Sequence, residues 1–300
     1  MSIVELNGVT KIYENKVAVR SLSLAIEAGQ MFGLLGPNGA GKTSSIRMMM
    51  GITMPDEGTV RLFDRPFERA SLDRVGYLPE ERGLYKKMKV IEQLIFFGQL
   101  HGLNSVDARK RSVEWAKRLE IADALERPTQ DLSKGMQQKI QFIASLLHDP
   151  GLIVMDEPFS GLDPVNAVLL QNALLELKDK WRAILFSTHR MDQVEKLCDS
   201  ICLINNGEAI LSGRVREIKS RYERNHLTIE FEGSAEFLKS PEVAEAKNYA
   251  GHAEIRLHPH GDAQKLLKEA ASMATIYRFE LAEPSLEEIF IQSVGGKSDA

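Results

Sequence analysis

The fold of this chain is decided by the stretch Gly36-Pro37-Asn38-Gly39-Ala40-Gly41-Lys42-Thr43-Ser44. It matches the pattern G-x-x-x-x-G-K-[ST], follows the apolar run 31–35, and opens a helical pattern through Ile46 and Met49. A strand, a glycine-rich loop and a helix in this order are typical of a phosphate-binding P-loop. An ordinary glycine turn before a helix is the alternative.

The residue types of this loop suit phosphate binding. Glycines let the backbone turn so that several N–H groups converge on phosphate oxygens, with the positive end of the following helix behind them. Lys42 adds a positive charge for the outer phosphates, and Thr43 offers a hydroxyl to Mg²⁺. We therefore predict that the loop binds a nucleotide through Gly36, Pro37, Asn38, Gly39, Ala40, Gly41, Lys42, Thr43 and Ser44.

The composition is that of a soluble globular protein. The 300 residues are 43% hydrophobic and 27% charged, enough for one large domain or two smaller ones. The net charge of −4 disfavours nucleic acid as a partner. No stretch approaches the roughly 18 apolar residues of a membrane span, so we expect a cytoplasmic chain. Cys198 and Cys202 lack a second pair, and we predict buried reduced thiols rather than a zinc site.

Acidic and imidazole side chains follow two further apolar runs. Run 152–155 leads into Asp156 and Glu157, and run 183–186 comes shortly before His189. The unit of about thirty residues has the length of a strand–helix–strand crossover. We therefore expect these side chains at one edge of a parallel sheet, where ligands bind. A helix cap or turn is the alternative for the acidic pair, and a histidine at a helix start for His189.

Phosphoryl transfer from a nucleotide needs a phosphate cradle, a metal and a group that orients water. We predict that Asp156 holds Mg²⁺ directly or through water and that Glu157 is the general base. His189 is placed to bond the terminal phosphate or the attacking water. Upstream of the P-loop, Tyr13 can stack on a purine base, with a strand-surface tyrosine as the alternative.

The segment Asp131-Leu132-Ser133-Lys134-Gly135-Met136-Gln137-Gln138-Lys139 resembles the signature motif of ATP-binding cassette (ABC) ATPases. The resemblance covers residues 1–220 and includes Walker A at 36–43, Walker B at 152–156 and a D-loop at 160–163. His189 then stands at the family's switch histidine and Tyr13 at its adenine-stacking aromatic. The resemblance implies ATP and Mg²⁺ as cofactors. It also implies that Ser133 and Gly135 meet the γ-phosphate bound to the opposite subunit.

Three positions depart from the family pattern. The signature has Lys134 and Met136 where glycine and glutamine are usual, although Ser133 and Gly135 are kept. Glu80 stands where the family has its Q-loop glutamine. Since a carboxylate still binds Mg²⁺ or water, we predict Thr43, Asp156 and Glu80 as the metal-binding residues.

The resemblance implies an α/β fold class: a RecA-like P-loop NTPase domain of the ABC type, with an antiparallel β subdomain and a helical subdomain. We place this domain at residues 1–224, with the helical insertion at about 85–150. Apolar patterns beyond it predict a small C-terminal α/β domain at 225–300, with a frayed tail from Gly295. That domain resembles the C-terminal extension of ATPase subunits of ABC-2 type exporters, including sodium efflux subunits.

The resemblance also implies partners. Two such domains dimerise head to tail, and we expect two copies of this chain, with a paralogue as the alternative. A separate polytopic membrane permease would contact the segment 81–87 through Leu84 and Tyr85, for which a plain surface loop is the alternative. We therefore predict an exporter ATPase, peripheral on the cytoplasmic face of the membrane. The rival is a soluble ABC ATPase acting mechanically in translation or DNA maintenance.

Overall fold

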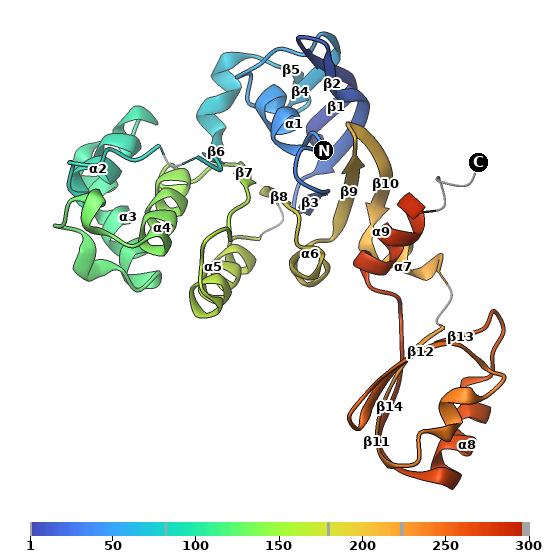
Figure 1. The fold of residues 1–300 in the computed structure, drawn as a ribbon. Coiled ribbons are helices and arrows are strands. Elements are labelled where there is room, and N and C mark those ends of the chain that lie inside the picture. The colour runs from blue at the N-terminus through green and yellow to red at the C-terminus, as the bar shows by residue number, and fades with distance from the viewer. Residues whose placement is uncertain (1, 82, 179–180, 223–224, 296–300) are drawn as a thin grey trace. The chain divides into compact units, whose positions relative to one another are not determined.

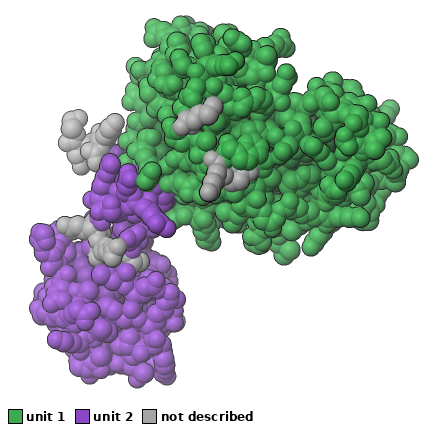
Figure 2. Space-filling view, turned by 180° about the vertical axis from the view of Figure 1, so that it is seen from behind, with its two compact units in different colours: residues 1–214 green, residues 215–300 purple. Residues whose placement is uncertain are grey.

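The computed structural model describes residues 2–81, 83–178, 181–222 and 225–295. The chain divides into two compact units, residues 1–214 and residues 215–300 (Figure 2). The predicted domain boundary at residue 224 lies outside the described residues and stays a prediction. Residues 296–300 of the predicted tail lie outside them as well.

A six-stranded sheet organises the first unit (Figure 1). In spatial order its strands are β10 (Glu208–Arg214), β9 (Ser200–Asn205), β3 (Met31–Leu35), β8 (Ala183–Thr188), β7 (Leu152–Asp156) and β6 (Val75–Leu78). β10 pairs antiparallel with β9, and the other strands pair parallel. β3, β7 and β8 are buried along their whole lengths, which explains their unbroken apolar runs.

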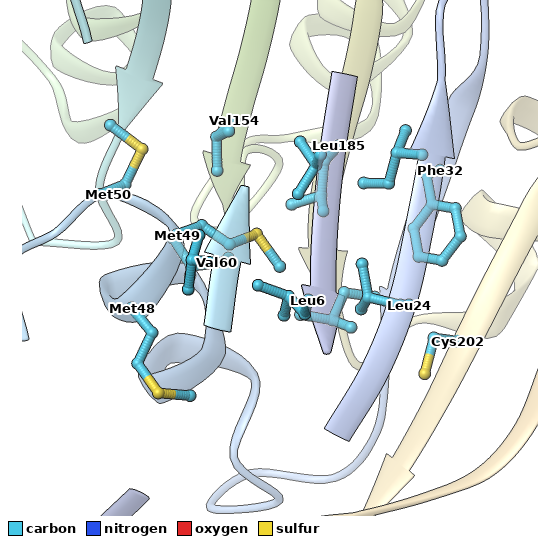
Figure 3. Packing of buried hydrophobic residues seen from close by; sticks show 14 of the residues in the cluster. Leu6, Leu24, Phe32, Met48, Met49, Met50, Val60, Val154, Leu185 and Cys202 are labelled. Atoms are coloured by element: carbon cyan, nitrogen blue, oxygen red, sulfur yellow. The ribbon is translucent and has the colours of Figure 1, made fainter. Parts of the chain in front are cut away.

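A second, antiparallel sheet shares a core with the first. Its strands are β2 (Lys16–Glu27), β1 (Ser2–Tyr13), β4 (Glu57–Leu62) and β5 (Arg65–Pro66). Along β2, Leu22, Leu24 and Ile26 are buried and the residues between them are exposed, because successive side chains of a strand point to opposite faces of the sheet. Helix α1 (Lys42–Met49) adds Met48 and Met49 to the core, where both sheets contribute side chains (Figure 3).

Three α-helices of the described residues stand between β6 and β7 in the chain, where the sequence predicts a helical insertion. They are α2 (Val90–Leu100), α3 (Ser105–Arg118) and α4 (Lys134–Leu146). The three pack on one another, and α4 also packs against β6. Two more helices, α5 (Pro164–Leu177) and α6 (Met191–Leu197), follow β7 and β8. The result is a repeated strand–helix order that brings the carboxyl ends of parallel strands to one edge.

The second unit contains an antiparallel sheet that shares a hydrophobic core with one helix. Its antiparallel sheet has the order β12 (Val243–Tyr249), β13 (His252–Leu257), β11 (His226–Gly233) and β14 (Ala274–Ala282). Its helices are α7 (Val215–Ser220), α8 (Ala263–Met273) and α9 (Leu286–Gly295). Leu227 and Ile229 of the sheet share a core with Leu266 of α8. Ser285 and Glu288 form a capping box at the start of α9, with Ser285 N donating to Glu288 Oε2 at 2.7 Å and Glu288 N donating to Ser285 Oγ at 3.2 Å.

Both cysteines are free thiols, and they differ in burial. Cys202 is fully buried and Cys198 partly buried. Burial raises the pKa of the Cys202 thiol to about 12, so this thiol stays protonated and unreactive. Among the helices of the described residues, none combines the length and apolar character needed to cross a bilayer.

Candidate functional site

The P-loop leaves β3 at Leu35 and closes on the start of α1 at Lys42. Two of its glycines adopt backbone conformations and close contacts that exclude a side chain. Gly41 has φ +110°, and a Cβ there would lie 2.4 Å from the Ala18 carbonyl oxygen. A Cβ on Gly36, at φ +150°, would lie 2.1 Å from the Ile204 carbonyl oxygen. The loop is therefore held against neighbouring backbone, and only glycine fits at either position.

The ammonium group of Lys42 is buried inside the curl of this loop. Its Nζ donates to the carbonyl oxygens of Gly36 at 2.7 Å and Pro37 at 3.1 Å. Burial lowers the pKa of Lys42, whereas the carboxylates of Glu157, Asp156 and Glu80 oppose that shift. Lys42 thus places a largely buried positive charge beside three acidic side chains at the edge of the cavity.

Asp156 ends β7 with a fully buried carboxylate whose two oxygens have different surroundings. Oδ1 accepts a short hydrogen bond from the hydroxyl of Ser187 on the neighbouring strand β8. Oδ2 is buried and has no hydrogen-bond partner within the described part of the chain. A buried carboxylate oxygen without a partner is costly unless something binds it, and carboxylate oxygen is a preferred ligand of Mg²⁺. The residues present therefore fit a magnesium ion at this oxygen.

The next residue, Glu157, adopts the left-handed conformation with φ +50°. Its N–H donates to both the carbonyl oxygen and the hydroxyl oxygen of Ser187, each at 3.2 Å. Its Oε1 lies 3.0 Å from Nδ1 of His189 and 3.9 Å from Nζ of Lys42. The Glu157 carboxylate is thus fixed between an imidazole and an ammonium group.

Lys42, Asp156 and Glu157 border a cavity of about 360 Å³, whereas His189, also among the described residues, contacts Glu157 but does not line the cavity. It is lined by Tyr13, Lys16, Ala18, Asn38, Gly39, Gly41, Lys42, Thr43, Ser44, Glu80, Asp156 and Glu157. Gly36 and Pro37 contribute carbonyl oxygens to Lys42, while Ala40 turns its side chain into the core. Lys16 and Ala18 belong to no phosphate-binding pattern in the sequence: Lys16 pairs with Tyr13 across β1 and β2, and the carbonyl oxygen of Ala18 lies against Gly41 of the loop. Their one signal is their place in the strand after Tyr13.

The signature residues occupy a different place in the same chain. Ser133 is the N-cap of α4, where its Oγ accepts from Met136 N at 3.2 Å, and Gly135 lies in the first turn. Neither residue lines the cavity. A Cβ on Gly135 would lie 3.4 Å from Leu162 Cδ2, and Gln138 donates to the carbonyl oxygen of Pro158 at 3.0 Å. The signature therefore packs against the segment that follows Asp156 and Glu157.

Two family models match the chain, the first within unit 1–214 and the second over most of unit 215–300. Residues 19–160 match the family described as "ABC transporter". Residues 213–294 match "ATP-binding protein DrrA1-3-like, C-terminal domain". The second match covers the unit in which the sequence predicts an exporter-type extension.

Known relatives carry the same assignment. The uncharacterized ABC transporter ATP-binding protein YhaQ of Bacillus subtilis is 42% identical over 97% of this chain and 98% of its own length. The ABC transporter ATP-binding protein NatA of the same organism is 39% identical over 67% of this chain and 83% of its own. The Nod factor export ATP-binding protein I of Ralstonia nicotianae is 40% identical over 72% of this chain and 68% of its own length.

Solved structures agree with this assignment. The ATP-binding subunit of an ABC transporter has a TM-score of 0.68 and 27% identity, covering 73% of this chain and 92% of that one. CbiO1 of Clostridium perfringens is part of the ABC transporter complex CbiONQ. It matches with a TM-score of 0.65 and 25% identity, and the match covers 73% of this chain and 91% of CbiO1. The predicted family, fold class and ATPase activity are confirmed. The chain belongs to the ABC transporter ATP-binding proteins, the ATPase subunits that power transport through a separate membrane subunit.

Proposed function

We propose that the cavity beside the P-loop binds ATP with Mg²⁺ and hydrolyses it to drive export through a membrane partner. One observation carries the proposal: one cavity is lined by Lys42, by Glu157 and by Asp156, whose buried Oδ2 has no hydrogen-bond partner among the described residues. Phosphate oxygens would accept hydrogen bonds from the N–H groups of the loop and from the Lys42 ammonium, and the adenine would stack on the ring of Tyr13.

Thr43 and Asp156 are the proposed holders of Mg²⁺, with Glu80 as a third candidate. Within the described residues, no cluster of three or more His, Cys, Asp or Glu side chains could hold a metal. Magnesium in nucleotide sites commonly takes one or two carboxylates and completes its shell with phosphate oxygens and water. When bound, the ion would neutralise charge that develops on the phosphate chain. Glu80 is exposed at the rim of the cavity, where a negative charge replaces the neutral amide of the family pattern.

Glu157 is the proposed general base. A base must reach the proton that it removes, and the contacts to Lys42 and His189 hold the Glu157 carboxylate over the cavity. The exposed ring of His189 would hydrogen-bond the terminal phosphate or the attacking water, beside the Glu157 carboxylate that it contacts. Together the two side chains would orient a water molecule toward the phosphate held by Lys42.

The separation of the signature from the cavity supports a head-to-tail dimer. Ser133 and Gly135 stand at the N-terminus of α4, where free N–H groups and the helix dipole attract phosphate. In a dimer of this kind, these residues of one subunit would close over ATP bound to the other. We propose two copies of this chain as the dimer and ATP-driven closure as the motion that is coupled to transport.

A second cavity supports contact with a membrane permease. It has a volume of about 340 Å³ and is bordered by Leu84, by Phe97 of α2 and by Ala144 of α4. Beside it, Tyr85 is 52% exposed. The centroid of its ring lies 6.0 Å from the ring centroid of Phe96 and 6.1 Å from that of Phe97. A partly exposed aromatic cluster is suited to anchor an apolar helix face. We propose that the permease docks here and holds the chain at the cytoplasmic face of the membrane. Arg82, within this segment, lies outside the described residues.

The rival function, mechanical work in translation or DNA maintenance, is not favoured. The matched relatives are named as transporter subunits, and one is named for Nod factor export. We propose that this chain also serves export, because one relative is named for export and because residues 213–294 match the DrrA1-3-like C-terminal domain.

The nucleotide site is tested by Tyr13→Ala. Loss of the ring lowers the affinity for ATP by about 5–100-fold, because base stacking contributes about 1–3 kcal/mol per base. Affinity for inorganic triphosphate stays unchanged, and Tyr13→Phe retains ATP binding. Fluorescence titration of the three proteins measures both ligands. Equal losses for ATP and triphosphate would remove Tyr13 from base recognition.

The docking site is tested by Tyr85→Ala. We expect recovery of the chain with membranes to fall at least about 10-fold, since a central aromatic anchor contributes 2 kcal/mol or more at an interface. Tyr85→Phe should behave as the parent, and Tyr249→Ala serves as a control because Tyr249 is 50% exposed in the second unit. Flotation of expressing-cell membranes is the measurement. Unchanged recovery of Tyr85→Ala would show that the segment is a plain surface loop.

A further inference from the structure

Ser187 connects the two acidic residues of the site from a neighbouring strand. It is the next-to-last residue of β8, and its side chain is fully buried. β8 pairs parallel with β7 in a register that sets Ser187 opposite Asp156. This register brings the serine hydroxyl to the point where β7 ends and Glu157 begins.

The direction of each hydrogen bond follows from the groups involved. The backbone N–H of Glu157 can only donate, so at 3.2 Å the Ser187 Oγ is its acceptor. A hydroxyl has a single hydrogen, which is therefore left for the contact with Asp156 Oδ1. One hydroxyl thus accepts from Glu157 and donates to Asp156 at the same time.

Both bonds bear on the geometry of the site. Because Oδ1 of Asp156 is taken, the carboxylate plane is fixed and the buried Oδ2 is the oxygen left for another ligand. The left-handed conformation of Glu157, φ +50°, is uncommon for residues other than glycine and persists only where surrounding bonds hold it. The carbonyl oxygen of Ser187 accepts from the same N–H at 3.2 Å and reinforces the hold.

We propose that Ser187 is a positioning residue that aims Asp156 Oδ2 at the magnesium ion and holds Glu157 over the cavity. This role rests on the proposed function. Partners that orient a metal ligand typically change metal affinity or activity by about 10–100-fold when removed. Ser187 should therefore govern how strongly Mg²⁺ assists ATP binding, beyond any effect on the rate.

The test measures the dissociation constant of ATP in excess EDTA and in excess Mg²⁺. The ratio is the constant in EDTA divided by the constant in Mg²⁺, so a high ratio means that Mg²⁺ strengthens ATP binding. In Ser187→Ala the EDTA affinity stays within about twofold of the parent, while the ratio falls about 10-fold toward that of Asp156→Asn. Ser187→Thr, which keeps the hydroxyl, restores the ratio. Ser187→Cys, similar in size but a weak donor, lowers it and remains informative if the alanine variant does not fold. Ser112→Ala is the matched control, because Ser112 is also fully buried and its hydroxyl donates to the Ala108 carbonyl oxygen of its own helix.

The outcomes separate the two levels of the proposal. A ratio unchanged in Ser187→Ala but lowered in Asp156→Asn overturns the role of Ser187 and leaves the metal site standing. A ratio unchanged in both variants overturns the proposed metal site, and the role of Ser187 falls with it. A ratio lowered equally by Ser112→Ala marks a general effect of losing a buried hydroxyl and also contradicts the proposal.

Discussion

Glu157→Gln lowers the turnover of ATP by about 10²–10⁴ and leaves ATP binding intact. The amide keeps the size of the carboxylate and can still contact His189, which lies 3.0 Å from Glu157 Oε1 in the parent. It cannot accept the proton of an attacking water. ATP would then stay unhydrolysed, and the dimer that it favours would accumulate.

Phosphate release under steady state and light scattering in Mg²⁺ and ATP measure the two effects. The exposed residue Glu68 provides a control, because Glu68→Gln removes the same charge outside the cavity. Parent-like turnover in Glu157→Gln would assign the base to another group. Slow turnover without a lasting dimer would support Glu157 as the general base and would contradict ATP-driven closure of the dimer.

Lys42→Ala weakens ATP binding by about 10²-fold or more, since loss of one partner in a buried charge pair costs about 2–5 kcal/mol. Lys42 is 6% exposed, and the carboxylates of Glu157, Asp156 and Glu80 act on its ammonium group, so its removal leaves these three negative side chains without the buried cation beside the phosphates. The carbonyl oxygens of Gly36 and Pro37 also lose their donor.

A nucleotide titration measures this loss, and thermal unfolding without nucleotide reports whether the variant is folded. Lys16→Ala is the matched control because Lys16 lines the same cavity from an exposed position. Its effect should stay below about 10-fold, as expected for a screened surface charge. Comparable losses in both variants would mean that cavity charge in general, rather than the buried Lys42, binds the phosphates.

Local sequence patterns were sufficient for the elements that carry the site. The unbroken apolar runs at β3, β7 and β8 mark strands buried on both faces, and the polar residues after them fall at one sheet edge. The P-loop pattern has a fixed spacing, so its bounds follow from the sequence alone. Asp156, Glu157 and His189 needed only the further rule that parallel strands end together.

Contacts set by strand pairing could not be predicted. Lys16 and Ala18 reach the cavity through the pairing of β1 with β2, whose register contains several irregularities. Ser187 precedes the histidine by two residues, but its role depends on which residue of β7 it faces. The sequence pattern does not indicate the short helix α7 (Val215–Ser220) either, because a helix of this length has too few turns to show a clear apolar stripe.

The central claim is that this ATPase works through a membrane subunit. Recovery of the tagged chain from mild-detergent extracts, with mass spectrometry of the co-purifying proteins, tests it most directly. We predict a polytopic membrane protein in stoichiometric amount, lost from Tyr85→Ala and retained by Tyr85→Phe. Recovery of an active ATPase with only ribosomal or DNA-associated proteins, or with no partner, would contradict the account.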